Sequence, residues 1–140
     1  GTVRAPHFAG GGVVFGPQPR DYALKVNRKA YRKARCMGLS QHAANGTIGV
    51  FAADGFDAPK TRDAVALVGG WRDEVPLVVV VSPEEAAAGL SFRNLERTVV
   101  LTPNEVEVTD LLWARSLLVS RSALDALTAA LAVHREEATA

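Results

Sequence analysis

The sequence LVVVV, residues 77–81, decides the fold class of this chain. Its five apolar residues do not alternate with polar ones, and four of them are valines. β-branched residues favour strands, and an unbroken apolar run is typical of a central strand that helices bury on both faces. We therefore predict a buried strand at Pro76–Val81 with helices on either side of its sheet.

Further strands are predicted on both sides of this one. Short runs rich in β-forming residues occupy Thr47–Ala52, Thr98–Leu101 and Ser116–Ser120. Longer segments separate the four runs, as crossover helices between parallel strands would. The chain is therefore predicted to be an α/β protein with a mainly parallel four-stranded sheet and helices on both faces.

Three helical signals lie between and after these strands. The segment Pro59–Val68 carries an apolar face, and Ser82–Glu85 supplies an N-cap serine, a proline at the first helical position and a capping-box glutamate. Ser122 with Asp125 is a weaker capping pair. Behind it, an apolar stripe with i, i+3, i+7 spacing predicts a last helix that covers the sheet, formed by Leu124, Leu127 and Leu131.

The N-terminal 21 residues have a different composition, with five glycines and three prolines. Such a segment cannot form a regular helix, so we predict an extended arm at 1–21 and a single globular α/β domain at 22–140. Asn27 is a suitable N-cap for a helix that opens this domain and runs to about Asn45, where Asn45-Gly46 is a stop signal.

Charge is divided unevenly along the chain. Residues 1–35 contain eight basic residues and one acidic residue, a net charge of +7, whereas the remaining residues carry −6, so that the whole chain has +1. The segment from Lys25 to Arg35 holds six cations and no acid. Like charges at this density repel one another unless an anion screens them, which favours a polyanion partner such as RNA.

On the predicted helix these cations form two adjacent stripes. Arg28, Arg32 and Arg35 line one stripe and Lys29 with Lys33 the next, while Ala30, Ala34, Met37 and Gln41 lie opposite. Two residues break the pattern. Leu39 falls within the basic arc, and Gly38 weakens a helix by roughly 1 kcal/mol relative to alanine. We therefore expect a kink or early fraying near Gly38.

Several function classes are disfavoured. One cysteine, Cys36, and three scattered histidines leave no disulfide framework and no plausible metal site, so neither metal nor cofactor is expected, and the chain is typical of an intracellular protein. Apolar runs such as residues 77–81 are far shorter than the roughly 20 residues of a membrane span, so no membrane partner is expected.

An enzymatic alternative starts from the glycine-rich turn at 10–16, whose backbone N–H groups could cradle a phosphate. The Walker pattern is absent, and Pro17 and Pro19 interrupt a dinucleotide fingerprint. His42 lies two residues from Ser40, so on a helix the two side chains point in different directions. The acidic pairs Glu84-Glu85 and Glu105 with Glu107 are better explained as helix-capping groups.

Particular motifs resemble one known family. GGGVVFGPQPRDY (Gly10–Tyr22) followed by LKVNRKAYRKA (Leu24–Ala34) resembles the bacterial-type large-subunit ribosomal protein L4 family. Further matches follow in order and cover essentially the whole chain: APKT at 58–61, SFRNL at 91–95, TDLL at 109–112 and LLVSRSALDAL at 117–127.

This resemblance implies a non-enzymatic constituent of the large ribosomal subunit. Family members bind rRNA with a globular α/β domain, support subunit assembly and extend a long internal loop to the peptide exit tunnel. Residues 1–16 would be the returning arm of that loop, with the N-terminal strand region and the outgoing half lacking. The implied partners are large-subunit rRNA, neighbouring ribosomal proteins and the protein's own messenger RNA, in a cytoplasmic ribosome or, alternatively, an organellar one.

Charge pattern and resemblance together predict the RNA-binding residues. The predicted side-chain contacts are Arg4, His7, Arg20, Lys25, Arg28, Lys29, Arg32, Lys33 and Arg35. Glycines allow the backbone to approach phosphates closely, and the predicted positions for this are Gly10, Gly11, Gly12 and Gly16.

Overall fold

The computed structural model describes residues 1–71 and 74–132. The predicted domain 22–140 thus includes residues, at 72–73 and 133–140, that lie outside the described part. The elements in chain order are α1 (Arg28–Ala44), β1 (Ile48–Phe51), the 3-10 helix η1 (Ala53–Gly55), α2 (Thr61–Trp71), β2 (Leu77–Val80), α3 (Ala86–Phe92), β3 (Thr98–Leu101), α4 (Val108–Trp113), β4 (Ser116–Ser120) and α5 (Arg121–Ala132).

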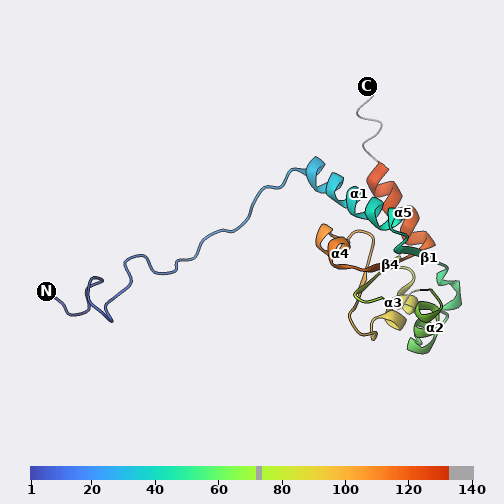
Figure 1. Ribbon diagram of the computed structural model, residues 1–140, viewed down its shortest axis with the longest axis horizontal. Coiled ribbons are helices and arrows are strands. Elements are labelled where there is room, and N and C mark those ends of the chain that lie inside the picture. The colour runs from blue at the N-terminus through green and yellow to red at the C-terminus, as the bar shows by residue number, and fades with distance from the viewer. Residues whose placement is uncertain (72–73, 133–140) are drawn as a thin grey trace, which may run out of the picture.

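The four strands form one sheet in the order β1-β4-β2-β3, and every pairing is parallel. The α/β fold class is therefore confirmed. Along this order the chain runs in one direction from β1 through α2 to β2 and through α3 to β3. It then runs back through α4 to β4, which lies between β1 and β2. Since parallel crossovers are right-handed, the return places α4 on the opposite face from α2 and α3 (Figure 1).

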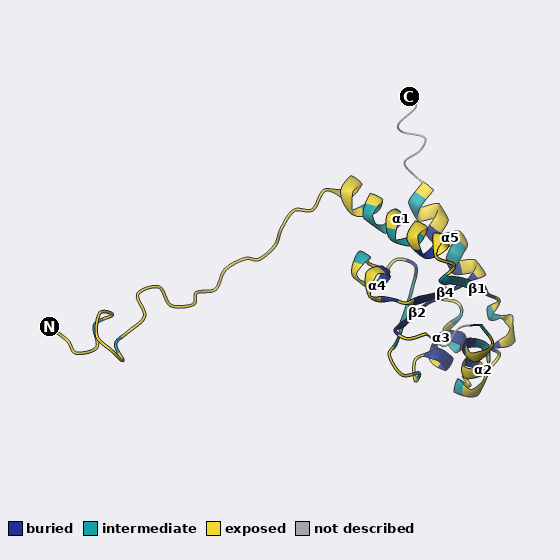
Figure 2. Ribbon diagram, in the orientation of Figure 1, coloured by how far each residue is buried: buried dark blue, intermediate teal, exposed yellow. Residues whose placement is uncertain are grey.

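Two apolar clusters fill the two faces of this sheet. Leu77 and Val79 of β2 pack with Phe92 of α3 in one cluster, whereas Val78 and Val80 pack with Leu127 of α5 in the other. Successive side chains of a strand point to opposite faces, so a strand covered on both sides needs apolar residues at every position. This confirms the interpretation of the LVVVV run. Figure 2 shows the burial concentrated on the strands and the inner sides of the helices.

Helix α1 continues through Gly38 to Ala44, so the expected fraying there was wrong. A Cβ on Gly38 would lie 3.1 Å from Leu111 Cδ1, which shows that the glycine allows α1 to approach α4 closely. One turn later, His42 is buried, with Nδ1 2.7 Å from Thr47 Oγ1 and Nε2 2.8 Å from the Leu111 carbonyl oxygen. Tertiary packing compensates for the low helix propensity of glycine.

Two predicted helix starts are also corrected. Helix α3 begins at Ala86, because Ser82–Glu85 closes a turn in which the Glu85 N–H donates to the Ser82 carbonyl and the Ser82 N–H donates to Glu85 Oε2. Helix α5 is capped by Ser120, whose hydroxyl accepts from the Ala123 N–H at 3.2 Å. Ser122 instead donates to Glu85 Oε1, so it does not cap the helix with Asp125.

Residues 1–27 contain neither helix nor strand, and Figure 1 shows them leading away from the domain. Nearly all of them are exposed. The proline and glycine content explains the missing regular structure. That the segment works as an RNA-penetrating arm, with the domain starting at residue 22, stays a prediction.

Candidate nucleic-acid interface

Helix α1 begins where the sequence predicted. The Asn27 side chain accepts a hydrogen bond from the Lys29 N–H at 3.0 Å, and the Tyr31 N–H donates to the Asn27 carbonyl. This cap fixes the first turn, which contains Arg28 and Lys29 and no acidic residue. The positive end of the helix dipole and two cations therefore coincide, and a nearby anion would relieve this unfavourable arrangement.

The lysines of α1 lie on its solvent side. Lys29 and Lys33 are exposed, as is Met37, with 63% of its surface accessible. Lys25 and Arg28, just before and at the start of the helix, are exposed as well. Within residues 1–71 and 74–132, none of these four cations forms an ion pair. They form a group of free positive charges around the first half of α1.

The other two arginines of the helix are turned towards the domain. Arg32 Nη2 donates to the carbonyl oxygens of Ala130, at 3.3 Å, and of Leu131, near the end of α5. A cation is favourable there because the last carbonyls of a helix lack intrahelical donors. Arg35 Nη2 donates to the Pro103 carbonyl oxygen at 3.2 Å. Both side chains are half-buried and attach α1 to the domain.

Sequence reasoning did not foresee this inward orientation, although one signal pointed to it. Leu39, which broke the basic pattern, packs against the apolar cluster on this face of the sheet, and buried His42 follows on the same side of the helix. Residues at i, i+4, i+7 and i+10 share one face of a helix, so Arg32 must face inward with them. The opposite side, with Ala30 and Met37, faces solvent.

Residues 2–12 form a compact loop. Its successive N–H groups on Ala5, Phe8 and Gly11 donate to carbonyl oxygens three residues earlier, and the Gly12 N–H donates to Arg4. Gly10 has a φ of +77°, and a Cβ on Gly11 would lie 2.0 Å from the Ala5 oxygen. Both positions thus require glycine for intrachain reasons. The backbone approach to RNA predicted for Gly10, Gly11, Gly12 and Gly16 stays a prediction.

The predicted side chains in residues 1–27 are spread along the segment. Arg4 and His7 lie in the loop, with the His7 and Phe8 ring centroids 4.2 Å apart. Further along, the Arg20 guanidinium stacks 4.0 Å from the centroid of the Tyr22 ring. Sequence reasoning missed this pair, although residues i and i+2 of an extended chain point to the same side.

The carboxyl edge of the sheet, where doubly wound folds hold ligands, is bridged by Glu85. Ligands in such folds lie beyond this edge, where neighbouring strands send their connections to opposite faces, and the boundary between β2 and β4 is one such place. Burial opposes ionisation of Glu85, but hydrogen bonds from the Ser120 and Ser122 hydroxyls and the Ser82 N–H outweigh it and lower the pKa of this carboxyl. A carboxylate of the chain itself therefore lies at the boundary between β2 and β4.

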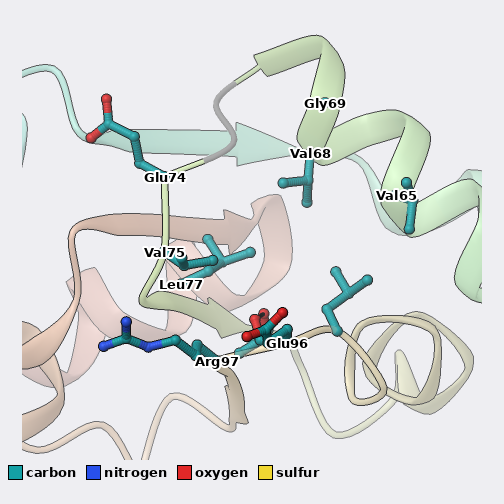
Figure 3. A pocket seen from close by; sticks show the side chains of 10 residues that line it. Val65, Val68, Gly69, Glu74, Val75, Leu77, Glu96 and Arg97 are labelled. Carbon is teal, nitrogen blue, oxygen red and sulfur yellow. Dashed lines mark hydrogen bonds between the residues drawn. The ribbon is translucent and has the colours of Figure 1, made fainter.

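A hollow of about 440 Å³ lies instead at the amino ends of β2 and β3 (Figure 3). Val68 and Leu77 form an apolar wall, and Glu96 and Arg97 lie at its edge. No serine, cysteine or histidine is among its lining residues. In the described ranges, no group of three or more potential metal-binding side chains occurs, and no helix is long and apolar enough to cross a membrane.

These features define a class of protein: a small α/β domain that carries a cationic helix and a glycine-rich basic segment. Its ligand edge is bridged by the chain's own carboxylate, and its residues 1–35 hold the net positive charge. A surface of this kind suits a polyanion.

Comparison with known proteins gives the particular family. The model of the ribosomal protein L4/L1 family matches residues 1–130, and the chain belongs to this family. The large ribosomal subunit protein uL4 of Rubrobacter xylanophilus is 40% identical over 131 residues, which are 92% of this chain and 62% of the relative. The uL4 protein of Amoebophilus asiaticus is 35% identical over 130 residues, 91% of this chain and 61% of its own.

The resemblance drawn from the motifs is thereby confirmed. The family consists of structural ribosomal proteins and not of enzymes, so the enzymatic alternative is not favoured. The uL4 protein of Brevibacillus brevis, 35% identical over 89% of this chain, is matched over 60% of its length. The chain thus spans about three fifths of the length of these curated relatives.

Proposed function

We propose that this chain binds rRNA as a structural constituent of the large ribosomal subunit and supports the assembly of that subunit. The observation that carries the proposal is the group of free cations at the start of α1. Lys25, Arg28, Lys29 and Lys33 are exposed without ion pairs in the described part of the chain. Their mutual repulsion is relieved by a phosphate backbone, which releases counterions on binding.

Within the predicted contact set, the residues divide into two groups. The four free cations, together with Arg4, His7 and Arg20 of the preceding segment, are proposed to contact RNA directly. Arg32 and Arg35 contribute mainly by holding α1 on the domain, because at least one nitrogen of each guanidinium already donates to a backbone carbonyl. The Nε of Arg35 is buried as well, so this guanidinium is only partly accessible to a phosphate.

Residues 1–21 are proposed to enter folded rRNA as part of the loop that approaches the peptide exit tunnel. Their glycines keep the chain slender, and their prolines limit its flexibility. We further propose that the negatively charged remainder of the chain meets neighbouring basic ribosomal proteins, and that the cationic surface also binds the protein's own messenger RNA. The bacterial relatives support a cytoplasmic ribosome; an organellar ribosome is the alternative.

Sedimentation tests this function. The tagged full chain, produced in bacterial cells, should travel with the large subunit in a sucrose gradient at low salt and persist at moderate salt. The Lys29→Glu/Lys33→Glu variant should shift towards the top of the gradient. Arg62→Glu, a charge reversal at an exposed position of α2, is the control outside α1 and should sediment as the wild type. If the wild type and both variants all remain at the top of the gradient with free protein, incorporation into the subunit is excluded.

A further inference from the structure

Three aromatic side chains of the first 27 residues are exposed. Phe8, Phe15 and Tyr22 expose 47%, 92% and 71% of their surfaces, and none belongs to either apolar cluster of the domain. Single exposed apolar residues are ordinary in proteins. Three aromatic rings within fifteen positions of a cationic segment are not explained by phosphate contacts, because a neutral ring gains little from a phosphate group.

Two of these rings already contact a planar nitrogen-containing group. The Arg20 guanidinium carbon lies 4.0 Å from the Tyr22 ring centroid, which covers one face of that ring. The His7 and Phe8 rings are 4.2 Å apart at an interplanar angle of 41°. Planar groups of this kind are those on which unpaired bases stack in RNA-protein complexes.

Local backbone structure holds both pairs in place. The Asp21 carboxylate accepts from the Ala23 N–H at 2.8 Å and closes a turn directly around Tyr22. Phe8 lies in the compact loop of residues 2–12, where its N–H donates to Ala5 and its carbonyl accepts from Gly11. Ordering the rings before binding lowers the entropy that a base must overcome when it stacks.

We propose that Phe8 and Tyr22, each with its planar neighbour, are stacking sites for unpaired RNA bases. The inference rests on the proposed rRNA binding and adds the kind of RNA that the segment recognises: single-stranded loops or bulges whose bases are accessible. The charge of residues 1–27 agrees with this, since Arg4, Arg20 and Lys25 oppose Asp21 alone. If the partner of this segment were a purely apolar protein surface, these three cations would have no opposite charge to contact.

The test compares RNA binding by the full chain and by variants that lose only the ring. Fluorescence anisotropy would give the affinities for a short labelled oligoadenylate and for a blunt RNA duplex of the same length. Phe8→Leu and Tyr22→Leu should each weaken single-strand binding by roughly 5- to 100-fold, the range of one lost base-aromatic stack. Duplex binding should change little, because its bases are already stacked.

Two controls separate stacking from other effects. Tyr22→Phe keeps the ring and should bind as the wild type, and Val14→Ala removes an exposed apolar side chain without a ring and should also be neutral. Equal losses for duplex and single strand, or leucine variants that bind the single strand normally, would overturn the stacking proposal while leaving rRNA binding intact. A wild-type chain that binds neither RNA would overturn both proposals.

Discussion

The division of the α1 cations into two groups leads to a quantitative prediction. Lys29→Ala/Lys33→Ala removes two free charges, whereas Arg32→Ala/Arg35→Ala removes two attachments of the helix to the domain. Each phosphate neutralised contributes about 0.7–0.9 to the slope of log affinity against log salt. The lysine variant should therefore have a slope smaller by about 1.4–1.8. Its affinity then becomes about tenfold less sensitive to a fourfold rise in salt.

The arginine variant should keep most of the wild-type salt dependence and lose thermal stability instead. Hydrogen bonds to charged groups contribute about 1.5–3 kcal/mol when buried, and the half-exposed positions of Arg32 and Arg35 reduce this to about 1 kcal/mol each. Loss of both should lower the melting temperature by about 4–8 °C for a domain of this size. The lysine variant should melt within about 2 °C of the wild type, since its exposed charges stabilise nothing.

The assays are filter binding to a large-subunit rRNA transcript over a series of salt concentrations and thermal unfolding followed by circular dichroism. The two variants have the same formal charge, so a difference in slope reports contact and not net charge. The reasoning is refuted if the arginine variant loses as much slope as the lysine variant, or if it unfolds at the wild-type temperature.

Four further substitutions probe the fold. Glu85→Gln should destabilise the protein at pH 7, and this difference should disappear in acid. The pKa of Glu85 is lowered in the folded state, so its contribution is present above the unfolded pKa and is lost as the pH falls through the folded one. Urea unfolding at both pH values measures this, and an equal penalty at both would contradict it. Gly38→Ala should cost about 1 kcal/mol because overpacking against Leu111 exceeds the gain in helix propensity. The control is Gly69→Ala, in α2 with open space around it, which should raise the free energy of unfolding by up to about 1 kcal/mol. If urea unfolding shows the same change for both variants, close packing of α1 against α4 does not explain the effect at Gly38. His42→Leu should cost about 1–3 kcal/mol in the same assay, because the carbonyl of Leu111 loses its buried partner, and a neutral result would show that this bond is dispensable.

The strands were predictable because their signals are local. The predicted bounds of Thr98–Leu101 and Ser116–Ser120 agree with β3 and β4, and the LVVVV run contains β2. The Asn27 cap was predictable for the same reason, since a cap acts on N–H groups two or three residues away. These elements depend on neighbours in the sequence.

The cap of α5 and the packing of Gly38 depend instead on residues that are distant in the sequence. Ser122 is a reasonable cap by sequence, but in the fold its hydroxyl meets Glu85, a residue 37 positions earlier. Ser120 then becomes the group that caps α5. Gly38 likewise weakens an isolated helix, and only the neighbouring Leu111 shows why glycine fits there.

Three properties could be inferred before any packing was known: the α/β fold class, the concentration of positive charge in residues 1–35 and the resemblance to the L4 family. Composition and periodicity express these properties without knowledge of the packing. Which cations remain free depends on how α1 packs against the domain. The sequence of a helix does not show which of its sides will pack against the domain. Leu39 and His42 pack there, and this turns Arg32 and Arg35 inward and leaves Lys29 and Lys33 in solvent.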